Sequence, residues 1–136
     1  MTTCDILVLG LGAMGSAAAY QLAKRGAKVV GIDRFAPPHS FGSSHGDSRI
    51  TRLAIGEGAH YTPLAMRSHE LWRAIETETG ANLMTQSGGL MISSPDRTSK
   101  LHVDDFFGNT VAAAERFGIA HEILDAREIK IGRVHV

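Results

Sequence analysis

The fold of this 136-residue chain is decided by the stretch I-L-V-L-G-L-G-A-M-G at residues 6–15. Its first four residues are apolar and predict a short buried strand, and the alanine-rich stretch 13–25 predicts a helix. The three glycines have different roles, since Gly10 allows the turn, Gly12 lets a pyrophosphate approach the backbone, and Gly15 lets helix and strand pack closely. The stretch therefore predicts a phosphate site at the helix N-terminus, where N–H groups are free and the helix dipole is positive.

A second apolar run, at residues 29–32, ends at an acid, Asp33. A carboxylate at this point of a strand-turn-helix-strand unit can accept hydrogen bonds from the hydroxyls of an adenosine ribose. Its negative charge would repel a 2′-phosphate, so the pattern favours FAD or NAD over NADP. The spacing does not separate FAD from NAD. The elements predict an α/β fold with a dinucleotide-binding unit at its start.

Length and composition fit one ordinary domain, with 43% hydrophobic residues. Fourteen Lys and Arg balance fourteen Asp and Glu, so the overall charge indicates neither a nucleic-acid partner nor an acidic membrane. No apolar run reaches the ~18 to 20 residues that span a bilayer, and we expect a cytoplasmic protein. Cys4 is the only cysteine and is expected to be a buried thiol without a disulfide partner, and the seven histidines show no metal-ligand grouping.

Beyond Asp33 the chain alternates loops with helical and extended stretches. Pro37 and Pro38 interrupt regular structure, and a loop rich in Ser, Gly and His follows at 40–47. The next predicted helix has Thr62 as its N-cap, Pro63 at its first position, Gly80 as its stop, and a buried face of Leu64, Leu71, Trp72 and Ile75. The remaining predicted elements are a strand at 90–92, a turn at Pro95-Asp96, a helix within 105–117 that ends at Gly118, a strand at 123–124, and a short helix capped by Asp125.

The segment H-S-F-G-S-S-H-G-D-S-R-I-T-R, at residues 39–52, collects small hydroxyl residues, glycines, two histidines and two arginines. Such a loop can hold anionic groups, because it combines backbone N–H groups with fixed positive charge. A solvated surface loop whose charges pair locally has the same composition. Both interpretations remain open from the residues alone.

Five short motifs resemble one family. They are D-R-F-x-P-P-H-S at 33–40, S-H-G-D-S-R at 44–49, G-E-G at 56–58, Y-T-P-L at 61–64 and E-L-W at 70–72. The combination resembles the monomeric sarcosine oxidases and N-methyltryptophan oxidases, which are flavoenzymes that oxidise N-methylated amino acids. The resemblance implies the N-terminal part of a doubly wound, FAD-binding Rossmann-like fold with the start of a substrate domain. It divides the chain into an FAD-binding region at 1–80, the beginning of the substrate domain at 81–129, and an atypical tail at 130–136.

The same resemblance implies a set of site residues. Arg49 and His45 would lie beside the flavin as the catalytic residues, with His45 either a general base or a packing and flavin-contact residue. Arg52 would bind the substrate carboxylate, since a guanidinium can do so with two parallel hydrogen bonds. The residues expected to bind FAD are Gly10, Gly12, Ala13, Met14, Gly15, Asp33, Arg34, Ser43, Ser44 and Arg49.

The expected reaction takes a hydride equivalent from the C–N unit of an N-methyl amino acid, yields an imine, and releases hydrogen peroxide when oxygen reoxidises the flavin. The implied partners are this small substrate and oxygen, and the implied full-length protein is a monomer. Family members are several times longer and carry a cysteine bonded to the flavin, which Cys4 does not match in position. Smaller departures are Ser44, where a histidine is frequent, and Ile55, where an aromatic residue is usual.

Three interpretations follow from these matches and departures. In the first, the chain is a truncated form of an FAD-dependent oxidase of N-methyl amino acids. In the second, it is an inactive fragment that binds FAD without turnover. In the third, it is the domain of an NAD-dependent dehydrogenase that shares only the glycine turn.

Overall fold

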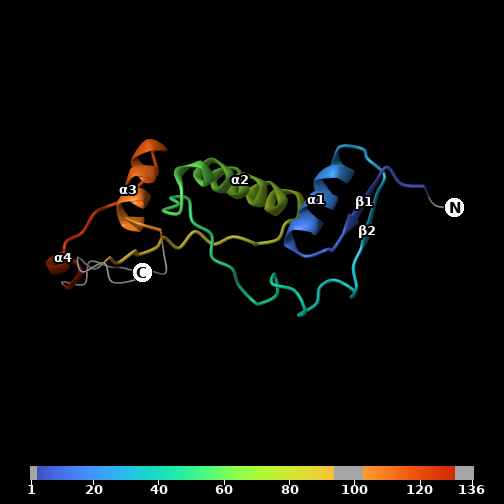
Figure 1. The fold of residues 1–136 in the computed structure, drawn as a ribbon, viewed down its shortest axis with the longest axis horizontal. Coiled ribbons are helices and arrows are strands. Elements are labelled where there is room, and N and C mark those ends of the chain that lie inside the picture. The colour runs from blue at the N-terminus through green and yellow to red at the C-terminus, as the bar shows by residue number, and fades with distance from the viewer. Residues whose placement is uncertain (1–2, 94–102, 131–136) are drawn as a thin grey trace. The chain divides into compact units, whose positions relative to one another are not determined.

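The computed structural model describes residues 3–93 and 103–130. Its elements are β1 (Ile6–Leu9), α1 (Ala13–Lys24), β2 (Val29–Ile32), the 3-10 turn η1 (Ala59–Tyr61), α2 (Thr62–Thr79), α3 (Phe106–Arg116) and α4 (Ala126–Lys130) (Figure 1). They fall into two compact units, Met1–Ile50 and Thr51–Val136. The predicted regions 1–80, 81–129 and 130–136 concern ligand roles and stay predictions. The turn predicted at Pro95-Asp96 and tail residues 131–136 lie outside the described residues.

The first unit is a β-α-β unit, as the sequence predicts. The strands β1 and β2 run parallel and side by side, with Ile6 opposite Val29 and Leu9 opposite Ile32, and α1 packs against both (Figure 1). Helix α1 ends at Lys24. The chain then reverses at Gly26, whose φ of 87° suits a residue without Cβ, and the N–H of Gly26 donates to the carbonyl of Ala23 over 2.9 Å.

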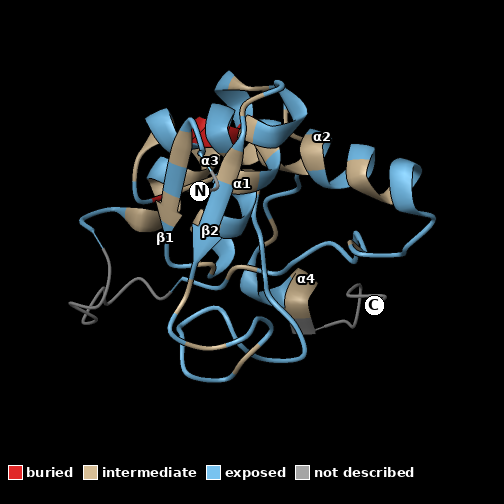
Figure 2. Ribbon diagram, turned by 90° about the vertical axis from the view of Figure 1, so that its right-hand side faces the viewer, coloured by how far each residue is buried: buried red, intermediate tan, exposed pale blue. Residues whose placement is uncertain are grey.

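The apolar strands are less buried than their sequence predicts. Leu9 is 83% exposed, and most of β2 is exposed as well (Figure 2). Parallel strands are normally covered on both faces, which is why a continuous apolar run predicts burial. One helix covers only part of a two-stranded sheet, so the strands keep apolar surface in contact with solvent. Cys4, expected to be buried, is also exposed.

The second unit begins its regular structure with η1, which leads directly into α2. Thr62 is therefore the first residue of the helix and Tyr61 is the N-cap. The predicted capping role of Thr62 is wrong, and Pro63 is the second residue of the helix instead of the first. Thr62 is fully buried, and its hydroxyl has no hydrogen-bond partner in the described part of the chain. Gly80 ends the helix as predicted, with a left-handed φ of 70° and an N–H donated to the carbonyl of Glu76 over 2.8 Å.

The buried face of α2 differs from the predicted one. Leu64 is 66% exposed and Trp72 is also exposed, whereas Leu71 and Ile75 are half-buried as expected. Met66 and His69 take the inner positions instead. The helical spacing is correct, but it does not decide which stripe of the helix meets the neighbouring segments.

The last two helices form where the sequence places them. Helix α3 contributes Ala113 and Ala114 to the buried core of this unit and is followed by Gly118, whose φ is 64°. Asp125 caps α4, since its carboxylate accepts the N–H groups of Arg127 and Glu128 over 2.7 and 2.9 Å. The strands predicted at 90–92 and 123–124 are wrong, because both stretches lie in the described residues without strand pairing. No helix in ranges 3–93 and 103–130 has the length and apolar character needed to cross a membrane.

Candidate functional site

The glycine turn between β1 and α1 brings backbone atoms into very close contact. Gly10 has a φ of 91°, and its N–H donates to the carbonyl of Ile32 over 2.7 Å, which anchors the turn to β2. A Cβ on Gly15 would overlap the carbonyl oxygen of Gly10 and lie 2.9 Å from its carbonyl carbon. Only glycine fits at position 15, so α1 can start directly against the turn.

Gly12 faces open space instead of neighbouring backbone. A Cβ there would meet only the Ser44 hydroxyl, at an ordinary contact distance of 3.5 Å. The space beside it is a cavity of about 680 Å³. Its lining residues come from the glycine turn and the loop after β2: Leu11, Gly12, Ala13, Pro37, Pro38, His39, Ser40, Gly42, Ser44, His45, Gly46 and Asp47. The N-terminus of α1 therefore opens into a cavity of a size that ligand pockets usually have.

Asp33 ties the turn to the end of β2. One carboxylate oxygen accepts the N–H of Leu11 over 2.6 Å, and the other accepts the N–H of Phe35 over 3.1 Å. These backbone hydrogen bonds, with a smaller contribution from His39, hold the pKa of Asp33 below its ordinary value. The side chain is 12% exposed and remains ionised at neutral pH. Its predicted contact with a ribose stays a prediction.

His39 is a site residue that the sequence analysis missed. Its Nε2 lies 3.3 Å from the Asp33 carboxylate, and its ring meets the ring of Phe35 edge-on with centroids 5.3 Å apart. Phe35 in turn stacks on Phe41 at 4.3 Å. These three rings and the acid form one cluster at the start of the loop. The signal is present in the sequence, because a histidine follows the double proline within a few residues of Asp33.

Ser44 and His45 lie in the loop after β2 and line the cavity at the start of α1. The Ser44 hydroxyl oxygen accepts the N–H of Ala13 over 3.1 Å. His45 Nδ1 lies 2.5 Å from the carbonyl oxygen of Gly42. Because a carbonyl oxygen can only accept, Nδ1 carries the proton, and in a neutral ring Nε2 has the free lone pair. His45 is therefore held in the tautomer that can take up a proton at Nε2.

Arg49 forms hydrogen bonds with backbone carbonyls of its own loop. Its guanidinium donates to the carbonyls of Ser48 over 2.7 Å and Ser43 over 3.4 Å. It also covers Gly46, whose φ is 125° and where a Cβ would lie 2.5 Å from Nη1 of Arg49. Of the predicted site residues, Gly12, Ala13, Ser44 and His45 line the cavity. The others in this unit, Gly10, Met14, Gly15, Asp33, Arg34, Ser43 and Arg49, are not among its lining residues.

Arg52 belongs to the second unit and already has an acidic partner. Its Nη2 donates to Oε1 of Glu57 over 2.7 Å, and its Cζ lies 5.5 Å from the ring centroid of Phe106. The side chain is 42% exposed, so the pair is open to solvent and exchangeable. The predicted carboxylate-binding group is thus present as a cation that a carboxylate already neutralises.

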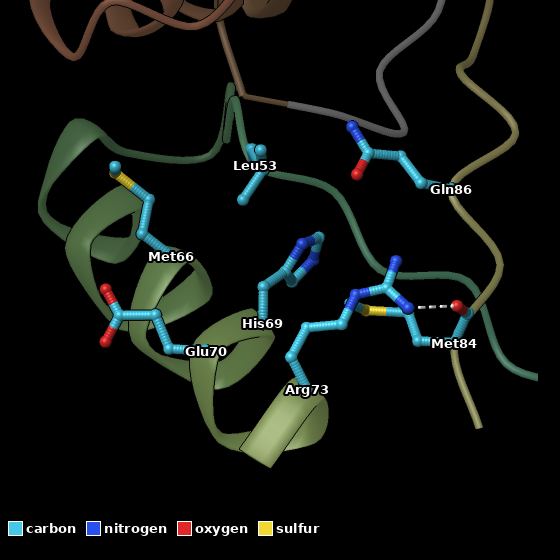
Figure 3. Close-up of a pocket in the computed structure, with 7 residues that line it drawn as sticks. All are labelled: Leu53, Met66, His69, Glu70, Arg73, Met84 and Gln86. Atoms are coloured by element: carbon cyan, nitrogen blue, oxygen red, sulfur yellow. Dashed lines mark hydrogen bonds between the residues drawn. The ribbon is translucent and has the colours of Figure 1, made fainter. Parts of the chain in front are cut away.

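A second cavity, of about 430 Å³, lies within the same unit between α2, Leu53 in the chain before it, and Met84 and Gln86 in the chain after it (Figure 3). Arg73 donates to the carbonyl of Met84 over 2.8 Å (Figure 3). It also donates to Glu76 over 2.7 Å. Glu76 accepts the N–H groups of Leu83 and Met84, and its pKa is lowered chiefly by the hydrogen bond from Arg73. These contacts join the extended segment to α2, which is a structural role.

Comparison with known proteins gives a consistent picture. The family model described as FAD dependent oxidoreductase matches residues 5–133. Monomeric sarcosine oxidase of Streptomyces avermitilis is 44% identical over 128 residues, which are 94% of this chain and 32% of that protein. Monomeric sarcosine oxidase of a Bacillus species is 43% identical, over 94% of this chain and 31% of that protein. N-methyl-L-tryptophan oxidase of Yersinia pestis is 36% identical, over 93% of this chain and 32% of that protein. The resemblance stated from the motifs is confirmed, and the chain spans about a third of the length of these relatives.

Proposed function

The chain belongs to the FAD dependent oxidoreductase family, and we propose on that basis that it binds FAD as the N-terminal part of an oxidase of N-methyl amino acids. The match over residues 5–133 carries this proposal. The similarity to proteins named for sarcosine and for N-methyl-L-tryptophan favours these two substrates. Membership of an FAD dependent family favours FAD over NAD, and so counts against the dehydrogenase interpretation.

The residues around the first cavity fit the pyrophosphate part of FAD. Gly12 leaves space where a larger residue would place a Cβ, and a phosphate in that space would meet the first N–H groups of α1. Ala13 N–H, which donates to Ser44, is one of these groups. Met14 and Gly15 follow in the same turn of the helix and supply the next N–H groups. Asp33 would hold the ribose, with Arg34, Ser43 and Arg49 as further contacts.

Bound FAD supplies an acceptor for the hydride equivalent that leaves the substrate, which becomes an imine, and it returns the electrons to oxygen as hydrogen peroxide. The chain's own residues bind and orient. Arg52 binds the substrate carboxylate once this has displaced Glu57 from its guanidinium. Arg49 places fixed positive charge in the loop, and His45 offers Nε2 as a proton acceptor. The cytoplasmic location, the monomeric state and the lack of a nucleic-acid partner stay predictions from the sequence.

The test of cofactor choice is equilibrium binding of FAD, NAD and FMN to the purified chain, followed by flavin fluorescence and isothermal titration. We expect FAD to bind most tightly and Gly12→Val to abolish its binding, because the added side chain enters the cavity. Gly89→Val is the matched control, since a Cβ there meets nothing within 4 Å and lies outside the site. Tighter binding of NAD than of FAD would refute the proposal.

The oxidase interpretation and the inactive-fragment interpretation differ in turnover. We expect the 136-residue chain with excess FAD to produce no peroxide from sarcosine or N-methyltryptophan, because residues 1–136 cover only about a third of the relatives' length. In a form of the protein that does turn over, Arg52→Ala is expected to lower kcat/KM by roughly 30-fold or more while flavin content is retained. Peroxide production by the chain at the rate of a full-length relative would contradict the proposed need for the rest of the protein.

A further inference from the structure

The guanidinium of Arg52 makes two contacts, one through its N–H edge and one with an aromatic ring. Its edge donates to Glu57 over 2.7 Å, and the ring of Phe106 lies 5.5 Å from its central carbon. An arginine uses its N–H edge for carboxylates and its flat face for aromatic rings, so the two contacts do not compete. When one carboxylate replaces another at the edge, the ring contact can stay in place.

The position of Phe106 is fixed by the helix that it starts. Its carbonyl oxygen accepts the hydroxyl of Thr110 over 2.8 Å. Gly56, the first glycine of G-E-G, is buried against Phe106 and Thr110. A Cβ on Gly56 would lie 2.6 Å from the Phe106 carbonyl oxygen and would also overlap the Thr110 hydroxyl. The turn that carries Glu57 is thus packed directly on the backbone of Phe106.

Arg52, Glu57 and Phe106 therefore form one connected group, although Phe106 is far from the other two in the chain. We propose that Phe106 is a positioning residue, which holds the face of the Arg52 guanidinium so that its edge is presented to a substrate carboxylate. This inference rests on the proposed role of Arg52 in binding that carboxylate. It assigns to α3 a function in the substrate site that none of the motifs in the sequence indicated.

The experiment uses the 136-residue chain with excess FAD, NMR of the Arg52 side chain, and titration with sarcosine. The Phe106 ring should shift the Arg52 side-chain protons upfield in the unaltered chain. Phe106→Leu should remove this shift, and Phe106→Tyr should keep it because the ring remains. Phe117→Leu is the matched control, since it removes the other α3-end ring that faces an arginine, Arg116, at 5.3 Å.

Sarcosine should bind two- to fivefold more weakly to Phe106→Leu, about the strength of a ring-cation contact at an exposed site, and with unchanged affinity to Phe106→Tyr and Phe117→Leu. The inference would be overturned if the chemical shifts of the Arg52 side-chain protons were the same in Phe106→Leu as in the unaltered chain. It would also be overturned if Phe106→Tyr lost as much affinity for sarcosine as Phe106→Leu. A ring shift that depends on Phe106, with no response of Arg52 to sarcosine, would uphold the contact and show that Arg52 does not bind the substrate carboxylate in this chain. The two failures are thus distinguishable.

Discussion

Replacing Gly15 by alanine should destabilise the first unit more than its chemistry suggests. The new Cβ would overlap the Gly10 carbonyl oxygen and lie 2.9 Å from its carbon, closer than the 3.0 Å below which real Cβ atoms are essentially never found. Neither partner is free to move. Gly10 is anchored through its N–H to Ile32, and position 15 lies in the first turn of α1.

The size of the effect comes from two opposed contributions. An overpacked site costs about 1–3 kcal/mol, and a clash with anchored backbone belongs at the upper end of this range. Alanine regains about 1 kcal/mol over glycine as a helix former. The free energy of unfolding should therefore fall by ~2 kcal/mol for Gly15→Ala.

Gly12→Ala is the matched control, because the two glycines have different roles. Its Cβ meets only the Ser44 hydroxyl at 3.5 Å, and its φ of −67° suits alanine. Stability should change by less than ~0.5 kcal/mol, whereas FAD affinity should fall because the methyl group enters the cavity. Urea unfolding followed by circular dichroism measures the first quantity and flavin fluorescence the second. Equal stability of the two variants would refute the close-packing argument for Gly15.

Three further predictions concern single side chains. Because the pKa of Asp33 is lowered in the folded chain, its contribution to stability is present above the ordinary pKa of 3.8 and is lost as pH falls through the folded-state pKa. The midpoint of urea unfolding should therefore fall more steeply with acid in the unaltered chain than in Asp33→Asn. Glu57→Gln should tighten sarcosine binding by up to about fivefold, since it removes the exposed carboxylate that competes for Arg52, and titration calorimetry would detect a failure as unchanged affinity. Nitrogen NMR of neutral His45 should find the proton on Nδ1, because Gly42 accepts it, and a proton on Nε2 would exclude the proposed base.

The parts of the fold that the sequence predicts well depend on local chemistry. The unit from β1 to β2 follows from glycines, apolar runs and an acid that are close together in the chain. Gly80 and Asp125 are correct helix boundaries for the same reason, since a left-handed glycine and a side-chain cap act within one turn. The wrong strands at 90–92 and 123–124 show the opposite case. A strand forms only with a partner, and the apolar composition of a short stretch does not supply one.

In the candidate site, likewise, some features could be predicted before the structure and others could not. The family resemblance identifies Ser44 as a candidate, but its contact with Ala13 joins residues 31 positions apart and no spacing indicates it. The same resemblance implies that Arg52 is the cation for a carboxylate, and the structure adds that Glu57 already holds it. Such pairings are set by how loops fold back, which depends on the packing of the whole unit. Resemblance to a family therefore identifies candidates better than it identifies the contacts that those candidates make.

Asp33 shows how one residue can serve both the fold and a ligand. An ionised carboxylate has about four acceptor positions, and the N–H groups of Leu11 and Phe35 use two of them, with His39 beside a third. These contacts therefore do not use every acceptor position of the carboxylate. Because the backbone hydrogen bonds also lower the pKa, the acid stays ionised while it holds the turn. The structural role of Asp33 does not exclude the ribose contact that the sequence predicts, and that contact stays a prediction.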